Sequence, residues 1–155
     1  MNMDSLQTKD MRLEQLMPLI RGQLEAGRTV RFKPRGVSML PMLRQDIDSV
    51  VLSPLPQKLR KYDLPLYQRD DGQYVLHRIV AVGDTYTCVG DNQFEMEPGV
   101  RRDQMIGLVT AYYRGDRHRS VSNSVYWLYV RGRHYSRPLR RRWRRLRNRI
   151  RNRMK

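Results

Sequence analysis

Three short segments of the chain carry residue types that together could cleave an acyl bond. Ser38 lies in the segment GVSMLPML at 36–43, between apolar residues and a proline. His77 lies in the largely apolar run QYVLHRIVAV at 73–82, and histidine is the commonest general base for a serine nucleophile. Asp91 and Glu97 follow in GDNQFEME, and a carboxylate that orients the histidine would complete an acyl-transfer triad.

Each of these segments also has a purely structural interpretation. A serine after a glycine often forms a turn, and an Asp-Asn turn often bonds its own backbone. A single histidine in an apolar strand is more often a core residue than a base. Strand alternation places His77 on one face with Val75 and Ile79, and Arg78 on the opposite face.

The periodicity around these segments predicts the elements that position them. Apolar residues recur with helical spacing from Asp10 to Ala26, and Gly27 follows as a stop signal. The helical stripe consists of Leu13, Leu16, Met17, Ile20 and Leu24. Short strands are expected at 29–33, 49–53, 64–69, 73–82, 85–89 and 105–114, because turn signals separate alternating or apolar runs. Pro65 suits an edge position for the third of these strands.

These elements predict a mostly β fold, a coiled sheet or partial barrel, with one helix at each end of the chain. We expect an N-terminal amphipathic helix at 1–28 and a catalytic core at 29–115. A connector at 116–130 and an arginine-rich amphipathic tail at 131–155 complete the expected organisation. The pattern predicts no signal peptide and no apolar run of the ~18–20 residues that a membrane span needs.

The charge is concentrated at the end of the chain. The net charge is +16, and residues 131–155 contribute 13 basic residues and no acidic one. Leu139, Trp143, Leu146 and Ile150 recur with helical spacing among the arginines, which predicts a basic amphipathic helix. We expect this tail to contact an anionic membrane surface, with nucleic acid as the alternative partner. The expected location is therefore cytoplasmic or at the membrane periphery.

Taken in order, GVSMLPML, YVLHRIV, GDNQFEME and the closing QMIGLV resemble the signal peptidase I-like serine peptidases. The resemblance covers residues 29–114, and its most specific part is Ser-Met-x-Pro with a downstream Gly-Asp-Asn. The bacterial signal peptidases and the self-cleaving repressors of this group have lysine where His77 stands. The chain is therefore similar to the Ser-His branch found in archaea and in the endoplasmic reticulum.

The resemblance implies a signal-peptidase-type fold and a serine endopeptidase that acts on a polypeptide, as in signal peptide processing, without a cofactor or metal. It implies that Ser38 is the nucleophile, His77 the base and Glu97 the third catalytic residue, with Asp91 in support. Gly36 stands where many relatives have a serine that helps to bind the oxyanion. The backbone N–H of Ser38 is then the main expected oxyanion donor.

Several alternatives stay open at this level. The chain could be an inactive or regulatory scaffold of the same fold, or a nucleic-acid-binding protein that acts through its tail. A self-cleaving transcription regulator needs a DNA-binding domain, and only about 28 residues precede the first predicted strand. Cys88 is the only cysteine, which excludes a disulfide framework, and an inert buried thiol is expected rather than a nucleophile. His118 and His134 do not have the spacing of metal ligands.

Overall fold

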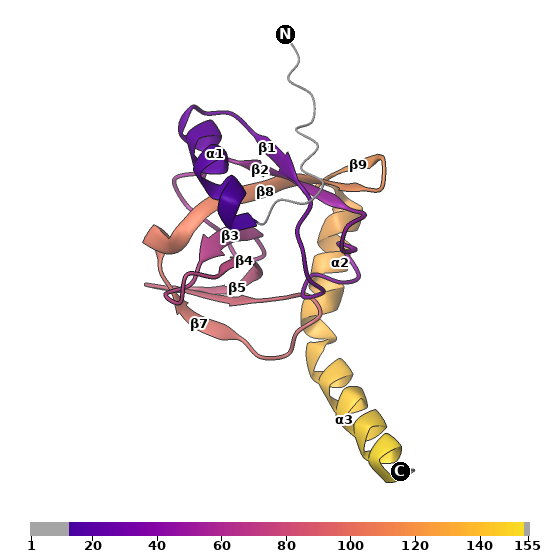
Figure 1. Cartoon of the computed structure of the whole chain (residues 1–155). Coiled ribbons are helices and arrows are strands. Elements are labelled where there is room, and N and C mark those ends of the chain that lie inside the picture. The colour runs from indigo at the N-terminus through magenta and orange to yellow at the C-terminus, as the bar shows by residue number, and fades with distance from the viewer. Residues whose placement is uncertain (1–12, 154–155) are drawn as a thin grey trace.

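The computed structural model describes residues 13–153 and contains two antiparallel sheets flanked by helices (Figure 1). The larger sheet has the order β1 (Val30–Phe32), β2 (Ser49–Ser53), β8 (Met105–Arg114), β3 (Pro65–Gln68) and β4 (Tyr74–Leu76), and β9 (Arg117–Ser120) pairs with β8. The smaller sheet has the order β5 (Arg78–Val82), β6 (Tyr86–Val89) and β7 (Glu97–Val100). A 3₁₀ turn at Arg102–Gln104 precedes β8.

Helices are as prominent as strands in this fold. The helices are α1 (Leu13–Glu25), α2 (Ser124–Tyr135) and α3 (Arg137–Arg153). Helix accounts for 32% and strand for 30%, so the protein is a mixed α/β fold with antiparallel sheets rather than a mostly β one. The expected partial barrel does not form, because the described strands divide between two separate sheets.

Helix α1 confirms the predicted apolar stripe. Met17, Ile20 and Leu24 are buried, and Leu13 and Leu16 pack half-buried against the same core. Gly27 ends the helix with φ +73°, and its N–H donates to the carbonyl of Leu24 at 2.9 Å. The predicted start at Asp10 lies outside the described residues.

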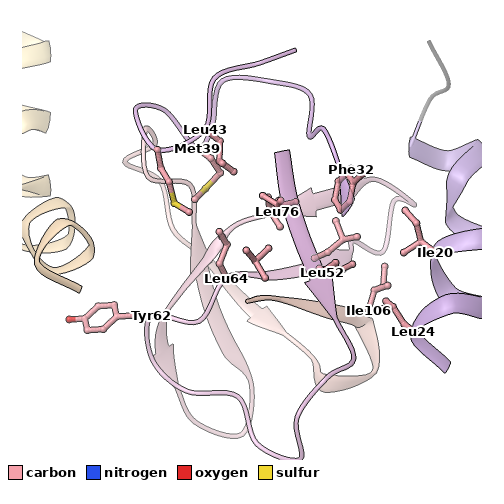
Figure 2. Close-up of a cluster of buried hydrophobic side chains, with 14 of the residues drawn as sticks. Ile20, Leu24, Phe32, Met39, Leu43, Leu52, Tyr62, Leu64, Leu76 and Ile106 are labelled. Carbon is pink, nitrogen blue, oxygen red and sulfur yellow. The ribbon is translucent and has the colours of Figure 1, made fainter. Parts of the chain in front are cut away.

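The main core joins α1 to the larger sheet and to the loop that carries Ser38. Figure 2 shows side chains of this cluster from α1, β1, β2, β4 and β8. Gly107 of β8 allows close contact with α1 and β2, because a Cβ there would lie within 2.7–3.0 Å of side-chain atoms of Leu52 and Leu24. Met39 and Leu43 are buried in the same cluster, so the core anchors the Ser38 loop.

Two predictions about strands are wrong. Strand β3 lies between β8 and β4 and is not an edge; Pro65 is tolerated because it is the first residue of the strand. The single strand predicted at 73–82 is two strands, β4 and β5, which belong to different sheets. His77 lies at the break, and both His77 and Arg78 are buried.

The strands predicted at 49–53 and 105–114 are confirmed as β2 and β8. The pattern did not predict β7, β9 or α2. The expected connector 116–130 contains β9 and the first half of α2, which Asn123 caps by accepting the N–H of Val125 at 2.9 Å. The last two residues of the expected tail lie outside the described residues. Within residues 13–153, no helix combines the length and apolar character needed to cross a bilayer.

Candidate functional site

Ser38 lies in a tight turn between β1 and β2, and it is held from two sides. Buried Met39 and Leu43 fix the turn to the main core. On the other side, the Gly-Asp-Asn turn after β6 forms hydrogen bonds with the backbone of the Ser38 turn. The N–H of Asn92 donates to the Ser38 carbonyl at 2.8 Å, and the side-chain amide of Asn92 donates to the Val37 carbonyl at 3.2 Å. The serine is therefore positioned by residues that are distant in sequence.

Gly90 is required by this close approach. A Cβ at position 90 would lie 2.7 Å from the Ser38 carbonyl oxygen and 3.0 Å from the Ser38 Cβ. Contacts of that length force backbone or side chains to shift. The first residue of Gly-Asp-Asn therefore provides room for the serine loop.

Asp91 forms a buried ion pair with Arg78. The distances are 2.8 Å from Nε to Oδ1 and 2.9 Å from NH2 to Oδ2, and the two side chains are 2% and 1% exposed. Burial raises the pKa of Asp91, but the Arg78 charge and hydrogen bonds outweigh it and hold the pKa below its usual value. Tyr129 also donates to Asp91 at 2.9 Å, and Arg78 donates to the Tyr126 hydroxyl at 2.7 Å.

Asp91 makes no hydrogen bond with His77 in the described structure; it acts on the residue that follows His77. The Arg78–Asp91 pair joins the start of β5 to the turn that holds Ser38. One ionic and hydrogen-bonded network thus fixes both chain segments of the candidate site. The sequence places Asp91 near the site, but only the structure identifies Arg78 as its partner.

His77 is 4% exposed and faces Tyr67 and Glu97 through Nδ1. Nδ1 lies 3.4 Å from the Tyr67 hydroxyl and 3.7 Å from Glu97 Oε2. Because Tyr67 donates its own hydrogen to Glu97 at 2.7 Å, its oxygen is left to accept from Nδ1–H. This assigns the proton to Nδ1 and leaves a lone pair on Nε2. Burial lowers the pKa of His77 to about 4, so the ring is neutral at pH 7.

The carboxylate of Glu97 has two partners, the Tyr67 hydroxyl beside His77 and the guanidinium of Arg69. Arg69 donates to both of its oxygens, at 2.7 and 2.8 Å, and these hydrogen bonds lower the pKa of Glu97. Sequence reasoning missed Tyr67 and Arg69. The sequence contained a signal for both: positions 67 and 69 are two residues apart in the predicted strand 64–69, so their side chains lie on the same face.

Ser38 and His77 line one cavity of about 190 Å³. Among residues 13–153, no hydrogen bond joins Ser38 Oγ to the imidazole, and none uses the backbone N–H of Ser38. That N–H is therefore available to an oxyanion. A larger cavity of about 770 Å³ adjoins it and shares Arg69, His77 and Gln93. Glu97 lines the larger cavity.

The basic tail begins as part of this site rather than as a separate segment. Arg133 donates to the carbonyl of Asp91 at 2.6 Å, and Arg140 donates to the same oxygen at 3.4 Å. Arg137 is buried and donates to the carbonyl of Gln93 at 3.3 Å. Beyond these contacts α3 extends away from the sheets (Figure 1). Its predicted apolar stripe, Leu139, Trp143, Leu146 and Ile150, is 50–66% exposed.

Other candidate chemistry is weaker at this site. Cys88 is buried, as expected, and burial raises the pKa of its thiol to about 12, so it is a poor nucleophile at neutral pH. Within residues 13–153, no three His, Cys, Asp or Glu side chains lie where they could hold a metal ion. Compared with known protein families, curated proteins and solved structures, the chain shows no match.

Proposed function

We propose that the protein is a serine endopeptidase of the signal peptidase type, with Ser38 as nucleophile and His77 as base. The observation that carries the proposal is that Ser38 and a neutral His77 line one cavity and are fixed by one network. The resemblance of GVSMLPML, YVLHRIV and GDNQFEME to that family adds to this support.

The proposed reaction uses the tautomer assigned above. Nε2 of His77 takes the proton of Ser38 Oγ as the oxygen attacks the peptide carbonyl carbon. The resulting oxyanion accepts a hydrogen bond from the free N–H of Ser38. When the C–N bond breaks, His77 returns the proton to the leaving amine, and water then hydrolyses the acyl-enzyme by the same route. Transfer requires Oγ and Nε2 to approach to about 2.6–3.2 Å in the substrate complex.

Tyr67 and Glu97 act on His77 as positioning residues. Together they hold Nδ1–H and place negative charge near the imidazolium that forms. Arg69 compensates part of the charge of Glu97, so Glu97 stabilises the imidazolium less than an unpaired carboxylate would. Asp91 acts one step further away, through Arg78 and Asn92.

The test is cleavage of a peptide pool by the full chain, followed by mass spectrometry. Ser38→Ala is expected to abolish cleavage, and His77→Gln to reduce it about 10²–10⁴-fold. Ser53→Ala is the matched control, because Ser53 is also partly exposed but bonds to Thr110 in the larger sheet. Retention of cleavage at the same bonds by Ser38→Ala would refute the proposal.

We further propose that α3 attaches this core to an anionic membrane surface. The exposed apolar stripe, with Trp143 at its centre, is flanked by arginines and has no covering element among residues 13–153. Basic residues near an anionic bilayer contribute about 1 kcal/mol each. The protein should cosediment with vesicles that contain phosphatidylserine, and the Leu139→Ser, Trp143→Ser double variant should not. Tighter binding to an RNA oligonucleotide that survives those substitutions would assign the tail to nucleic acid instead.

A further inference from the structure

The arginines of α3 do not all face the same way, and one group lines the cavity beside His77. Arg141, Arg144 and Arg145, the cavity arginines, form its wall together with Asn148. Their spacing of i, i+3, i+4 and i+7 keeps them on one helical face. At about 100° per residue, the apolar stripe lies on the opposite face of α3. The two faces of this helix can therefore serve different partners.

This wall is attached to the candidate site. The guanidinium groups of Arg140 and Arg144 lie 5.6 and 5.5 Å from the centre of the Phe94 ring, within the range of a cation–π contact. Phe94 lies two residues after Asn92 of the Gly-Asp-Asn turn, and Arg137 donates to the carbonyl of Gln93 between them. The turn that holds Ser38 thus also holds the arginine wall.

The cavity carries positive charge that the protein does not compensate. No cavity arginine forms an ion pair with an acidic side chain within residues 13–153. The carboxylate of Glu97 in the cavity is already paired with Arg69, which leaves Glu95 as the other acidic residue of the lining. Three positive charges therefore face this space against one unpaired carboxylate.

The cavity is also continuous with the proposed reactive centre. It shares His77, Arg69 and Gln93 with the smaller cavity that contains Ser38. A polypeptide with a carbonyl at Ser38 would place adjacent residues beside His77 and then against the arginine wall. Side chains in that position would meet exposed guanidinium groups, which bind carboxylates with two parallel hydrogen bonds.

We infer that the substrates are polypeptides with acidic side chains next to the scissile bond, and that the cavity arginines select them. This inference rests on the proposed peptidase function. It assigns the cavity face of α3 to an acidic peptide, whereas the opposite face carries the apolar stripe. It also distinguishes the substrate from a purely apolar segment, because the wall offers three charges that only an acidic partner satisfies.

The test compares two dodecapeptide pools that are identical except for Glu or Gln at the positions flanking a cleaved bond. The wild-type full chain should cleave the Glu pool with at least about tenfold higher kcat/KM at low salt. Replacing all three cavity arginines with Gln should bring this ratio close to one. The matched control replaces Arg142, Arg149 and Arg153, which are on the same helix but do not line the cavity, and should keep the ratio. Equal cleavage of both pools by the wild type would overturn the inference and leave the peptidase proposal intact.

A binding measurement separates failure of the inference from failure of the proposed reaction. Ser38→Ala should bind a fluorescent Glu peptide at least about tenfold more tightly than its Gln counterpart, and the cavity substitutions should remove the difference. If nothing is cleaved but this binding pattern is observed, the cavity assignment stands and the peptidase proposal fails. If RNA displaces the Glu peptide and binds more tightly through the same arginines, the cavity is a nucleic-acid site and the inference fails.

Discussion

Asp91→Asn tests whether the buried ion pair holds the candidate site together. The substitution keeps the shape of the side chain but leaves the Arg78 guanidinium, 2% exposed, without a counter-charge. Removing one partner of a buried pair typically costs about 3–5 kcal/mol. Domains of this size have a total stability of about 5–15 kcal/mol, so the loss is a large fraction of it.

The assay is urea unfolding at pH 7, followed by far-ultraviolet circular dichroism. With a slope of about 2 kcal/mol per molar urea, the midpoint should fall by about 1.5–2.5 M. Asp70→Asn is the matched control, because Asp70 pairs with Arg101 at the surface, where the side chains are 77% and 49% exposed. An exposed pair contributes about 0–1 kcal/mol, so the control midpoint should move by less than about 0.5 M.

A second substitution identifies the cause. Arg78→Met in the Asp91→Asn background removes the uncompensated charge, so the double variant should recover part of the lost stability. Recovery excludes a simple packing defect at position 91. If Asp91→Asn shifts the midpoint no more than Asp70→Asn does, the buried ion pair does not stabilise the fold.

The same geometry leads to four further predictions. Burial lowers the pKa of His77 from 6.5 to about 4, so between these pH values the unfolded chain binds a proton that the folded chain does not, and stability falls as the pH decreases through this range. In urea titrations at several pH values, His77→Gln should remove about 3 kcal/mol of this loss of stability. An unchanged pH dependence in His77→Gln would contradict the burial argument. Because the pKa of His77 is lowered, kcat/KM should fall in acid with a midpoint near pH 4 rather than 6.5. Gly90→Ala should displace Ser38, costing about 1–3 kcal/mol in urea unfolding and at least tenfold in kcat. Gly22→Ala in α1, where no atom lies within 4 Å of the added methyl group, should leave kcat unchanged. Tyr67→Phe removes the hydroxyl group between Glu97 and His77. It should lower kcat about tenfold with little change in KM, and it should shift the pH at which kcat/KM falls in acid. An unchanged kcat and pH profile would show that the hydroxyl does not position His77.

The described site differs from a simple linear triad. The negative charge near His77 belongs to Glu97. The Tyr67 hydroxyl lies between the two, within hydrogen-bond distance of both, and Glu97 also pairs with Arg69. Asp91, expected in a supporting role, pairs with Arg78 rather than with His77. A carboxylate that is close in sequence to a candidate catalytic residue can therefore serve to hold two backbone segments together.

The amino-acid sequence by itself determined the elements whose patterns are local. The helical stripe of α1, the exact bounds of β2 and β8, and the charge division between core and tail all follow from residue spacing. It also indicated Ser38, His77 and the Gly-Asp-Asn turn as one group, through their order along the chain.

Only the tertiary structure decided which sheet each strand joins and which side chains meet. Alternation in 73–82 predicts a continuous strand, because it reports the face of each residue but not its hydrogen-bonded neighbour. The chain changes sheets at His77, which buries Arg78 against Asp91. Tyr67 and the arginines of α3 reach the same site from distant parts of the chain. Those contacts depend on how separate elements pack, and a local pattern carries no information about packing between elements.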